Sequence, residues 1–273
     1  MLPALQTFVR LTSSDFFIEI QEVLLFVRRR YDDFNRPTVV FLHDSLGCVE
    51  LWRDFPEKLC EAINCNIVVY DRQGYGRSAS LPTHLRNNDY LENEAYVLHD
   101  LLEALDLKNV ILFGHSDGGS IALVAAAKYP FMCLAVIVEA AHIFVENVTL
   151  KGIRAAVHAY ATTNLKARLE KYHGDKTETI FKAWTDTWLG QEFQSWNIES
   201  FLPSIVCPVL FIQGDRDEYG SVIQMEGVAQ KSGGSVDTFL IPNTHHTPHK
   251  EAAMAVIEKV SEFVRRLEID RIA

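Results

Sequence analysis

The most informative segment of this chain is Asn109-Val-Ile-Leu-Phe-Gly-His-Ser-Asp-Gly-Gly-Ser120, in which a short apolar run enters a Gly-x-Ser-x-Gly-Gly corner. An alanine-rich helical pattern follows through Lys128. A strand that turns sharply into a helix needs small residues at the corner, because a side chain at Gly114 or Gly118 would meet neighbouring backbone. Ser116 lies at the apex, where its hydroxyl would face a ligand and the first amides of the helix would face developing negative charge. This is a suitable position for a nucleophile, although so short a motif also occurs by chance.

Strand and helix patterns alternate on both sides of this corner. Apolar runs predict strands at 38–42, 66–70, 109–114, 134–138, 207–213 and 235–241, after a hairpin of two strands at 16–20 and 23–31. Helical spacing predicts helices at 50–63, 89–107, 116–129, 221–231 and 248–267. Apolar strands that alternate with helices indicate an α/β fold with a mostly parallel sheet between two layers of helices.

The alternation stops between His142 and Leu202, where helical stretches occur without a convincing buried strand. We therefore expect a core formed by residues 1–141 and 203–273, and a helical cap at 142–202 over the carboxyl edge of the sheet, where open α/β sheets bind ligands. Trp184 and Trp188 lie at helical spacing and could form either the wall of a substrate cavity or the core of the cap. His142 could line the same cavity or lie at a surface hinge.

Composition excludes several classes of partner. The 273 residues carry a formal net charge of -10, which disfavours nucleic acids and anionic membranes because their phosphates would be repelled. The five cysteines form no Cys-x-x-Cys pair, which favours reduced thiols and a cytoplasmic location. No apolar run approaches the roughly 20 residues of a membrane helix. We expect a protein without a nucleic-acid or membrane partner, either a monomer or a homodimer.

Two later loops carry side chains that could activate Ser116. A serine hydroxyl is a weak nucleophile unless a base removes its proton and a third group orients that base. Residues 214–220 follow one predicted strand and contain Asp217, and residues 242–251 follow the next and contain His246. Because the carboxyl ends of parallel strands meet at one edge, these side chains could converge on Ser116.

Five motifs in order make the chain resemble the α/β-hydrolases from residue 16 to its end. They are His-Asp at 43–44, Tyr-Asp-Arg-Gln-Gly-Tyr-Gly-Arg-Ser at 70–78, the corner at 114–119, Gly-Asp-Arg-Asp at 214–217 and His-Thr-Pro-His-Lys-Glu at 246–251. The corner is particularly similar to that of the biphenyl-hydrolase-like esterases. The resemblance implies an α/β-hydrolase fold, an eight-stranded, mostly parallel sheet flanked by helices, with a helical cap insertion.

Carried over by position, the resemblance assigns the nucleophile to Ser116, the acid to Asp217 and the base to His246. Many relatives have glycine before that histidine, whereas this chain has His245, which is therefore the alternative base. The spacing to Pro248 and Glu251 favours His246. Alternatives for the acid are Asp215, Glu218 and Glu139.

The oxyanion of an acyl-transfer reaction also needs hydrogen-bond donors. The backbone amide of Asp117 is the first candidate and that of Ser45 is the second, with Leu46 as the alternative. The family usually has glycine after the histidine of this loop, and Asp44 replaces it here. The Asp117 side chain could also bind a cationic group of the substrate, or it could face solvent, Arg72 or Arg77.

His245, His246 and His249 could instead suggest a metal site. The chain has no His-Glu-x-x-His helix there and no nearby cysteine, and Pro248 interrupts the segment, so we expect neither a metal nor an organic cofactor. The sequence predicts a serine hydrolase that cleaves a small-molecule carboxylic ester through an acyl-enzyme. The alternatives are a carbon-carbon bond hydrolase, a lactonase, an amidase or a ligand receptor of low turnover. Serine at the corner argues against the dehalogenases and epoxide hydrolases, which use a carboxylate nucleophile.

Overall fold

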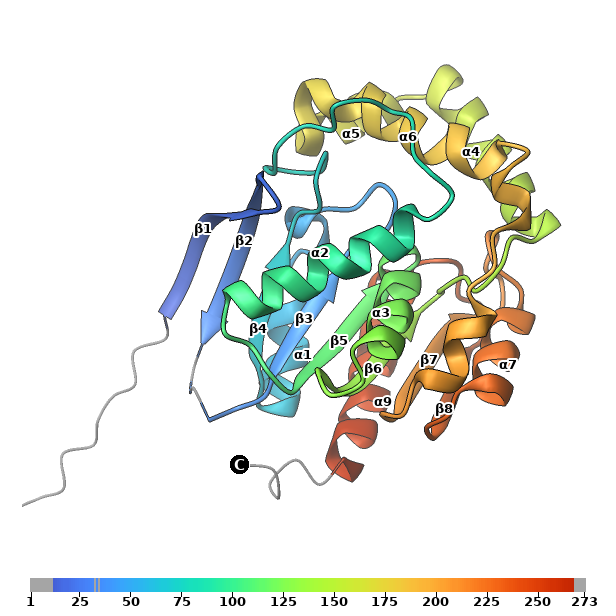
Figure 1. The fold of residues 1–273 in the computed structure, drawn as a ribbon. Helices are drawn as coiled ribbons and strands as arrows, with labels where there is room; N and C mark the ends of the chain where they lie inside the picture. Colours follow the sequence, from blue (N-terminus) through green and yellow to red (C-terminus); the bar gives the residue numbers. More distant parts are fainter. Residues whose placement is uncertain (1–11, 32, 34, 268–273) are drawn as a thin grey trace, which may run out of the picture.

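The computed structural model describes residues 12–31, 33 and 35–267 and contains one eight-stranded sheet. The strand order is β1-β2-β4-β3-β5-β6-β7-β8; β1 and β2 form an antiparallel hairpin, β2 pairs antiparallel with β4, and the remaining pairs are parallel (Figure 1). The strands are β1 (Thr12–Ile20), β2 (Val23–Tyr31), β3 (Thr38–Leu42), β4 (Asn66–Tyr70), β5 (Val110–His115), β6 (Cys133–Glu139), β7 (Val209–Gly214) and β8 (Val236–Ile241). The predicted α/β-hydrolase architecture is confirmed.

Two layers of helices cover the sheet. One hydrophobic cluster joins the sheet to α2 (Tyr90–Ala104), α3 (Asp117–Lys128) and α7 (Val222–Lys231), and a second joins its other face to α1 (Phe55–Ile63) and α9 (Ala253–Arg266). The parallel strands β3, β4 and β5 are buried along their whole length, which explains their continuous apolar sequence. This burial fixes the positions of the loops at the carboxyl edge.

Two of the predicted helices are each divided. The helix expected at 50–63 is a short 3₁₀ turn, η1 (Val49–Trp52), followed by α1, and Arg53 between them has a φ of 54°. Pro56 explains the new start, because proline fits the first turn of a helix but not its interior. The helix expected at 248–267 is α8 (Pro248–Glu251) followed by α9, with Ala252 at a non-helical φ of -135°.

The segment between β6 and β7 is helical. It contains α4 (Asn147–Thr162), α5 (Leu165–His173), η2 (Gly174–Lys176), α6 (Thr177–Leu189), η3 (Phe193–Ser195) and η4 (Glu199–Ser204). Figure 1 shows α4, α5 and α6 at the top of the molecule, beyond the sheet edge. We refer to residues 142–202 below as the insertion.

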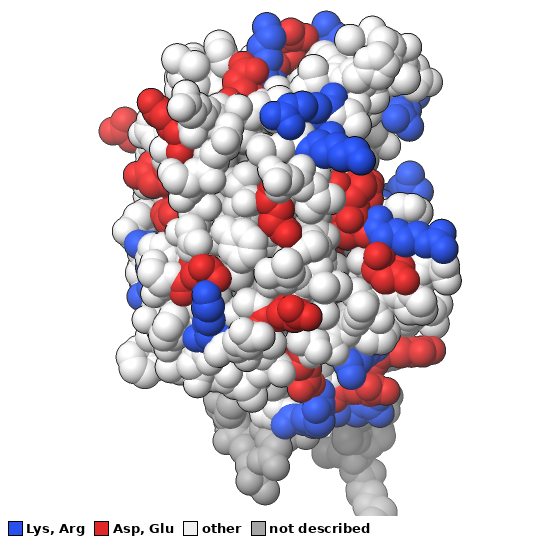
Figure 2. Space-filling view, turned by 90° about the vertical axis from the view of Figure 1, so that its right-hand side faces the viewer, with Lys and Arg blue, Asp and Glu red and all other residues white. Residues whose placement is uncertain are grey.

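The surface carries no concentrated charge on the face drawn in Figure 2, where basic and acidic side chains are interspersed. Within the described part of the chain, no helix is both long and apolar enough to cross a bilayer. All five cysteines are buried, and no disulfide joins the residues that the structure describes.

Candidate functional site

The corner after β5 has the geometry that its glycines predict. Ser116 has a φ of 53° and a ψ of -119°, a backbone conformation that residues other than glycine seldom adopt. A Cβ at Gly114 would lie 2.2 Å from the Gly118 carbonyl oxygen, and one at Gly118 would lie 2.1 Å from the Leu42 carbonyl oxygen. Glycine is therefore required at both positions, because backbone atoms cannot move aside.

Ser116, His246 and Asp217 form one line of hydrogen bonds. The His246 Nε2 atom lies 2.9 Å from Ser116 Oγ, and its Nδ1 atom lies 2.8 Å from Asp217 Oδ1. Because an ionised carboxylate only accepts hydrogen bonds, Nδ1 carries the proton and Nε2 accepts from the serine hydroxyl. This is the arrangement that general-base activation of a serine requires.

The alternative base and acids lie elsewhere. The exposed His245 is bonded through Nδ1 to Glu251, and Asp215 is exposed. Glu139 is bonded to His249, and Glu218 lines the cavity described below without a hydrogen bond to His246 among the described contacts. None of these groups joins the line through Ser116.

The loops that carry Asp217 and His246 are packed against each other. A Cβ at Gly214 would lie 2.1 Å from the Thr244 carbonyl oxygen, so glycine is needed for this close approach. The Arg216 amide donates to the same carbonyl at 2.9 Å. The acid and the base are therefore held together by main-chain contacts as well as by their own hydrogen bond.

The environment keeps Asp217 ionised. Burial by itself would raise its pKa, but the charge and hydrogen bond of His246 and the amide of Tyr219, which donates at 2.8 Å, lower the pKa to about 2. Burial would also lower the pKa of His246, yet the Asp217 carboxylate raises it above the ordinary value. The two shifts favour a carboxylate that stabilises positive charge on the imidazole.

A cavity of about 200 Å³ opens beside Ser116. The residues singled out from the sequence that line it are Asp44, Ser45, Leu46, Ser116, Asp117, His142, Trp184, Trp188, Glu218 and His246. Sequence reasoning missed Thr149, Ile153, Tyr219 and Thr247, which also line it. The ring of Tyr219 lies 4.7 Å from that of His246, and its place two residues after Asp217 was the only available signal.

Trp188 belongs both to the cavity wall and to the core of the insertion. It is 1% exposed, and its ring lies 5.0 Å from Phe193 and 5.6 Å from Trp196. Trp184 is 7% exposed and also lines the cavity. His142 is buried rather than at the surface; its ring lies 5.2 Å from Trp188, and burial lowers its pKa.

Asp117 is buried between the insertion and the strand-to-helix corner at 114–119, which we call the elbow. Tyr90 Oη donates to its Oδ2 at 3.1 Å, and Trp188 Nε1 donates to Tyr90 Oη at 2.8 Å. Arg72 lies 3.7 Å from the same carboxylate oxygen, whereas Arg77 contacts Asp15. The second oxygen, Oδ1, has no hydrogen-bond partner among the described residues.

A tight turn forms the loop after β3. The Gly47 amide donates to the Asp44 carbonyl at 3.2 Å, with Ser45 and Leu46 between them. Arg72 Nη2 donates to the same carbonyl at 3.0 Å. The Asp117 amide lies in the first turn of α3, where amides have no acceptor within the helix. The choice between Ser45 and Leu46 as the second oxyanion donor stays a prediction.

The insertion is bonded to this loop and to residues 75–78. His173 Nε2 donates to the Leu46 carbonyl at 3.0 Å, and the Gly76 amide donates to His173 Nδ1 at 3.0 Å. Lys176 Nζ donates to the carbonyls of Tyr75, Gly76 and Ser78. Sequence reasoning did not identify either residue, since their partners lie about 100 residues or more away.

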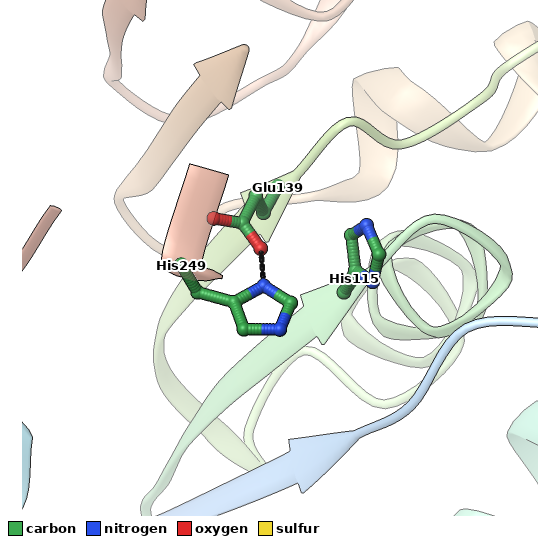
Figure 3. Close-up of side chains that lie close together, drawn as sticks. All are labelled: His115, Glu139 and His249. Carbon is green, nitrogen blue, oxygen red and sulfur yellow. Dashed lines mark hydrogen bonds and ion pairs between the residues drawn. The ribbon is translucent and has the colours of Figure 1, made fainter. Parts of the chain in front are cut away.

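One group of described side chains has a composition that could hold a metal ion: His115, Glu139 and His249, which are all buried (Figure 3). Figure 3 shows His249 bonded to Glu139, with His115 beside them. His115 Nε2 is also engaged, with the His246 carbonyl at 2.8 Å. Neither His245 nor His246 belongs to this group.

Comparisons with known proteins agree with this architecture. The sequence pattern of the alpha/beta hydrolase family matches residues 39–259. Serine hydrolase BPHL of Mus musculus is 30% identical over 205 residues, covering 73% of this chain and 69% of that protein. The 2-succinyl-6-hydroxy-2,4-cyclohexadiene-1-carboxylate synthase of Enterobacter sp. (strain 638) is 22% identical over 84% of this chain and 92% of its own. The crystal structure of the enol-lactonase from Burkholderia xenovorans LB400 superposes with a TM-score of 0.73 at 16% identity, covering 92% of this chain and 100% of that one. On this evidence, the chain belongs to the alpha/beta hydrolase family.

Proposed function

We propose that this protein is a serine hydrolase that cleaves a small-molecule carboxylic ester through an acyl-enzyme. The main support is the continuous line of hydrogen bonds from Ser116 through His246 to Asp217 at the side of a cavity. The similarity to serine hydrolase BPHL supports the same chemistry. In this proposal, the reaction needs no metal or organic cofactor.

Each residue has a defined task in the proposed reaction. Ser116 Oγ attacks the ester carbonyl while His246 Nε2 takes its proton, and the amides of Asp117 and Ser45 bind the oxyanion. His246 then returns the proton to the leaving alcohol. A water molecule then attacks the carbonyl of the acyl-enzyme while His246 takes its proton. His246 returns this proton to Ser116 Oγ as the bond to the acyl group breaks, and the carboxylic acid is released. Asp217 keeps the imidazole in the required tautomer throughout.

The function can be tested directly with a fluorophosphonate probe and short p-nitrophenyl esters. We expect the probe to label Ser116 alone, identified by mass spectrometry of the digested protein, and the esters to be hydrolysed with a burst of p-nitrophenol. A matched lactone and anilide separate ester cleavage from lactonase and amidase activity. A folded sample that neither reacts with the probe nor turns over an ester would contradict the proposal and favour a ligand receptor.

The cavity also supports a proposal on the substrate's charge. Three carboxylate residues line it, Asp44, Asp117 and Glu218, and none of its described lining residues is a lysine or an arginine. The Oδ1 atom of Asp117 has no hydrogen-bond partner in the described part of the chain, and Asp117 directly follows the nucleophile in sequence. Trp184 and Trp188 add aromatic surface, which attracts cations. We propose that Asp117 binds an ammonium group on the acyl part of the ester.

The variant Asp117→Asn tests this recognition. We expect wild type to prefer an aminoacyl ester over its desamino analogue by about tenfold to a hundredfold in kcat/KM, because a hydrogen bond to a charged group contributes about 1.5–3 kcal/mol. Asn has nearly the same shape but no charge, so the preference should disappear while the desamino ester is still cleaved. Steady-state kinetics on the two esters measure this. An equal preference in both proteins would rule out the role of Asp117.

A further inference from the structure

His115 lies behind the base, and both of its ring nitrogens face acceptors. It ends β5, directly before Ser116, and is 1% exposed. Its Nε2 atom lies 2.8 Å from the main-chain carbonyl oxygen of His246. Its Nδ1 atom lies 3.7 Å from Asp44 Oδ1, within the range of an ion pair although too far for a hydrogen bond. His115 therefore connects the elbow to two other loops of the site.

The contact with His246 fixes main chain rather than the imidazole. A carbonyl can only accept, so His115 Nε2 carries the proton and donates it. A buried carbonyl without a donor is costly, so this bond holds the loop of residues 242–251, the base loop, at one position. Two consecutive residues of the elbow therefore contact His246: His115 contacts its main-chain carbonyl, and Ser116 Oγ contacts its imidazole ring.

Asp44 supplies the second contact, and it is the position at which this chain departs from the usual glycine of the α/β-hydrolases. Burial by itself would raise the pKa of its carboxyl group, but the neighbouring His115, Lys250 and His43 side chains hold that pKa well below its ordinary value. Asp44 is therefore a carboxylate, and it faces the Nδ1 atom of the His115 ring. The pair resembles the contact of Asp217 with His246 in chemistry, although its distance is longer.

The surroundings leave His115 little freedom. Its ring lies 5.0 Å from that of His249, 5.2 Å from that of His246 and 6.4 Å from that of Trp52. His249 is bonded to Glu139 and lies in α8, three residues after His246 (Figure 3). The Glu139–His249 pair thus fixes the beginning of α8, and His115 fixes the main chain just before it.

We propose that Asp44 and His115 are a positioning pair for the catalytic base: the Asp44 carboxylate orients His115, which in turn holds the His246 main chain so that its imidazole stays at hydrogen-bond distance from Ser116. This inference rests on the proposed function. Through the His115 side chain, the pair joins the turn at 44–47, the elbow and the base loop. Loss of the pair should therefore lower the rate of the chemical step, measured by kcat, more than it weakens substrate binding.

The first test separates kcat from KM with the neutral ester p-nitrophenyl acetate. In His115→Leu, which has no donor, we expect kcat to fall by about tenfold to a hundredfold with KM within about twofold, because small displacements of a catalytic group are costly. His115→Gln retains an N–H donor and should recover most of the loss. A His115→Leu enzyme with kcat within twofold of wild type would overturn the proposal.

A double-mutant cycle tests whether Asp44 acts through His115. Asp44→Asn keeps the size of the side chain and removes its charge, so we expect a several-fold loss of kcat in the wild-type background and no further loss in His115→Leu. Equal effects of Asp44→Asn in both backgrounds would show that Asp44 acts independently, which overturns the pair.

A spectroscopic test does not depend on turnover. In the Ser116→Ala background, the proton between His246 Nδ1 and Asp217 should give a downfield ¹H resonance. We expect this resonance to be sharp when residue 115 is His or Gln, and broadened or lost in the His115→Leu variant. Cys60→Ala, which removes a buried side chain in α1, should leave the resonance unchanged and shows the effect of destabilisation alone. An unchanged resonance in the folded leucine variant would refute the positioning role, whether or not the protein proves to be an esterase.

Discussion

The variant Ser116→Ala is expected to lose about 10⁶-fold in kcat on the best ester substrate and to lose fluorophosphonate labelling completely, because no other group can form the acyl-enzyme. Ser116 Oγ makes its hydrogen bond to His246 alone among the described contacts, so its removal costs the fold little. Far-UV circular dichroism and thermal unfolding should match wild type. Stopped-flow assays for wild type and long incubations for the variant together cover this range of hydrolysis rates.

The control for this experiment is Ser261→Ala. Ser261 lies in α9, where its hydroxyl donates to the Ile257 carbonyl, and it does not line the cavity. This variant should keep wild-type kinetics and probe labelling. If Ser116→Ala hydrolysed esters at more than about a hundredth of the wild-type rate, another nucleophile would have to be sought, since loss of a true nucleophile costs far more.

The second large effect is expected in Asp217→Asn, where kcat should fall by about 10⁴-fold because the amide favours the wrong tautomer of His246. The pH profile should change as well. A general base must be neutral, so the acid limb of kcat/KM follows the pKa of His246, which Asp217 raises above its ordinary 6.5 despite burial. Wild type should therefore lose activity as the pH falls through a value above 6.5. Without the carboxylate, burial lowers that pKa, and the acid limb should move to lower pH.

Asp215→Asn is the matched control for Asp217→Asn. Asp215 is exposed, two residues earlier in the same loop, and should leave both kcat and the acid limb unchanged. The pH profiles are measured at constant ionic strength on the same p-nitrophenyl ester, with p-nitrophenol followed at a pH-independent wavelength. An acid limb that stays in place in Asp217→Asn would contradict the assignment of Asp217 as the partner of His246.

The sequence was sufficient for the sheet and the elbow because both depend on local rules. Continuous apolar runs such as 38–42 and 66–70 predict strands that are covered on both faces, and that is where β3 and β4 lie. Glycine at 114 and 118 indicates close backbone approaches, and the structure contains both. The choice of His246 over His245 depended on the spacing to Pro248 and Glu251; in the structure, Glu251 is bonded to His245.

Other features depend on contacts that periodicity does not encode. The break of the first predicted helix at Arg53 was missed, although Pro56 carried a signal for a helix start. The helical spacing of Trp188 could not decide whether it lines the cavity or packs in the core of the insertion, because its side chain does both. His115 was read only as part of the elbow, since its partners Asp44 and His246 come from distant loops.

The bonds that His173 and Lys176 make to the core limit how the insertion can move. Raising residues 142–202 as one rigid body would break two bonds of His173 and three of Lys176, and it would leave carbonyls of residues 75–78 without their donor. We therefore expect substrate and product to exchange without breaking the bonds that His173 and Lys176, at the junction of α5 and η2, make to the core. For the same reason, a chimaera that receives this segment from another hydrolase must keep a histidine at 173 and a lysine at 176, or the Leu46 carbonyl and the carbonyls of residues 75–78 lose these donors.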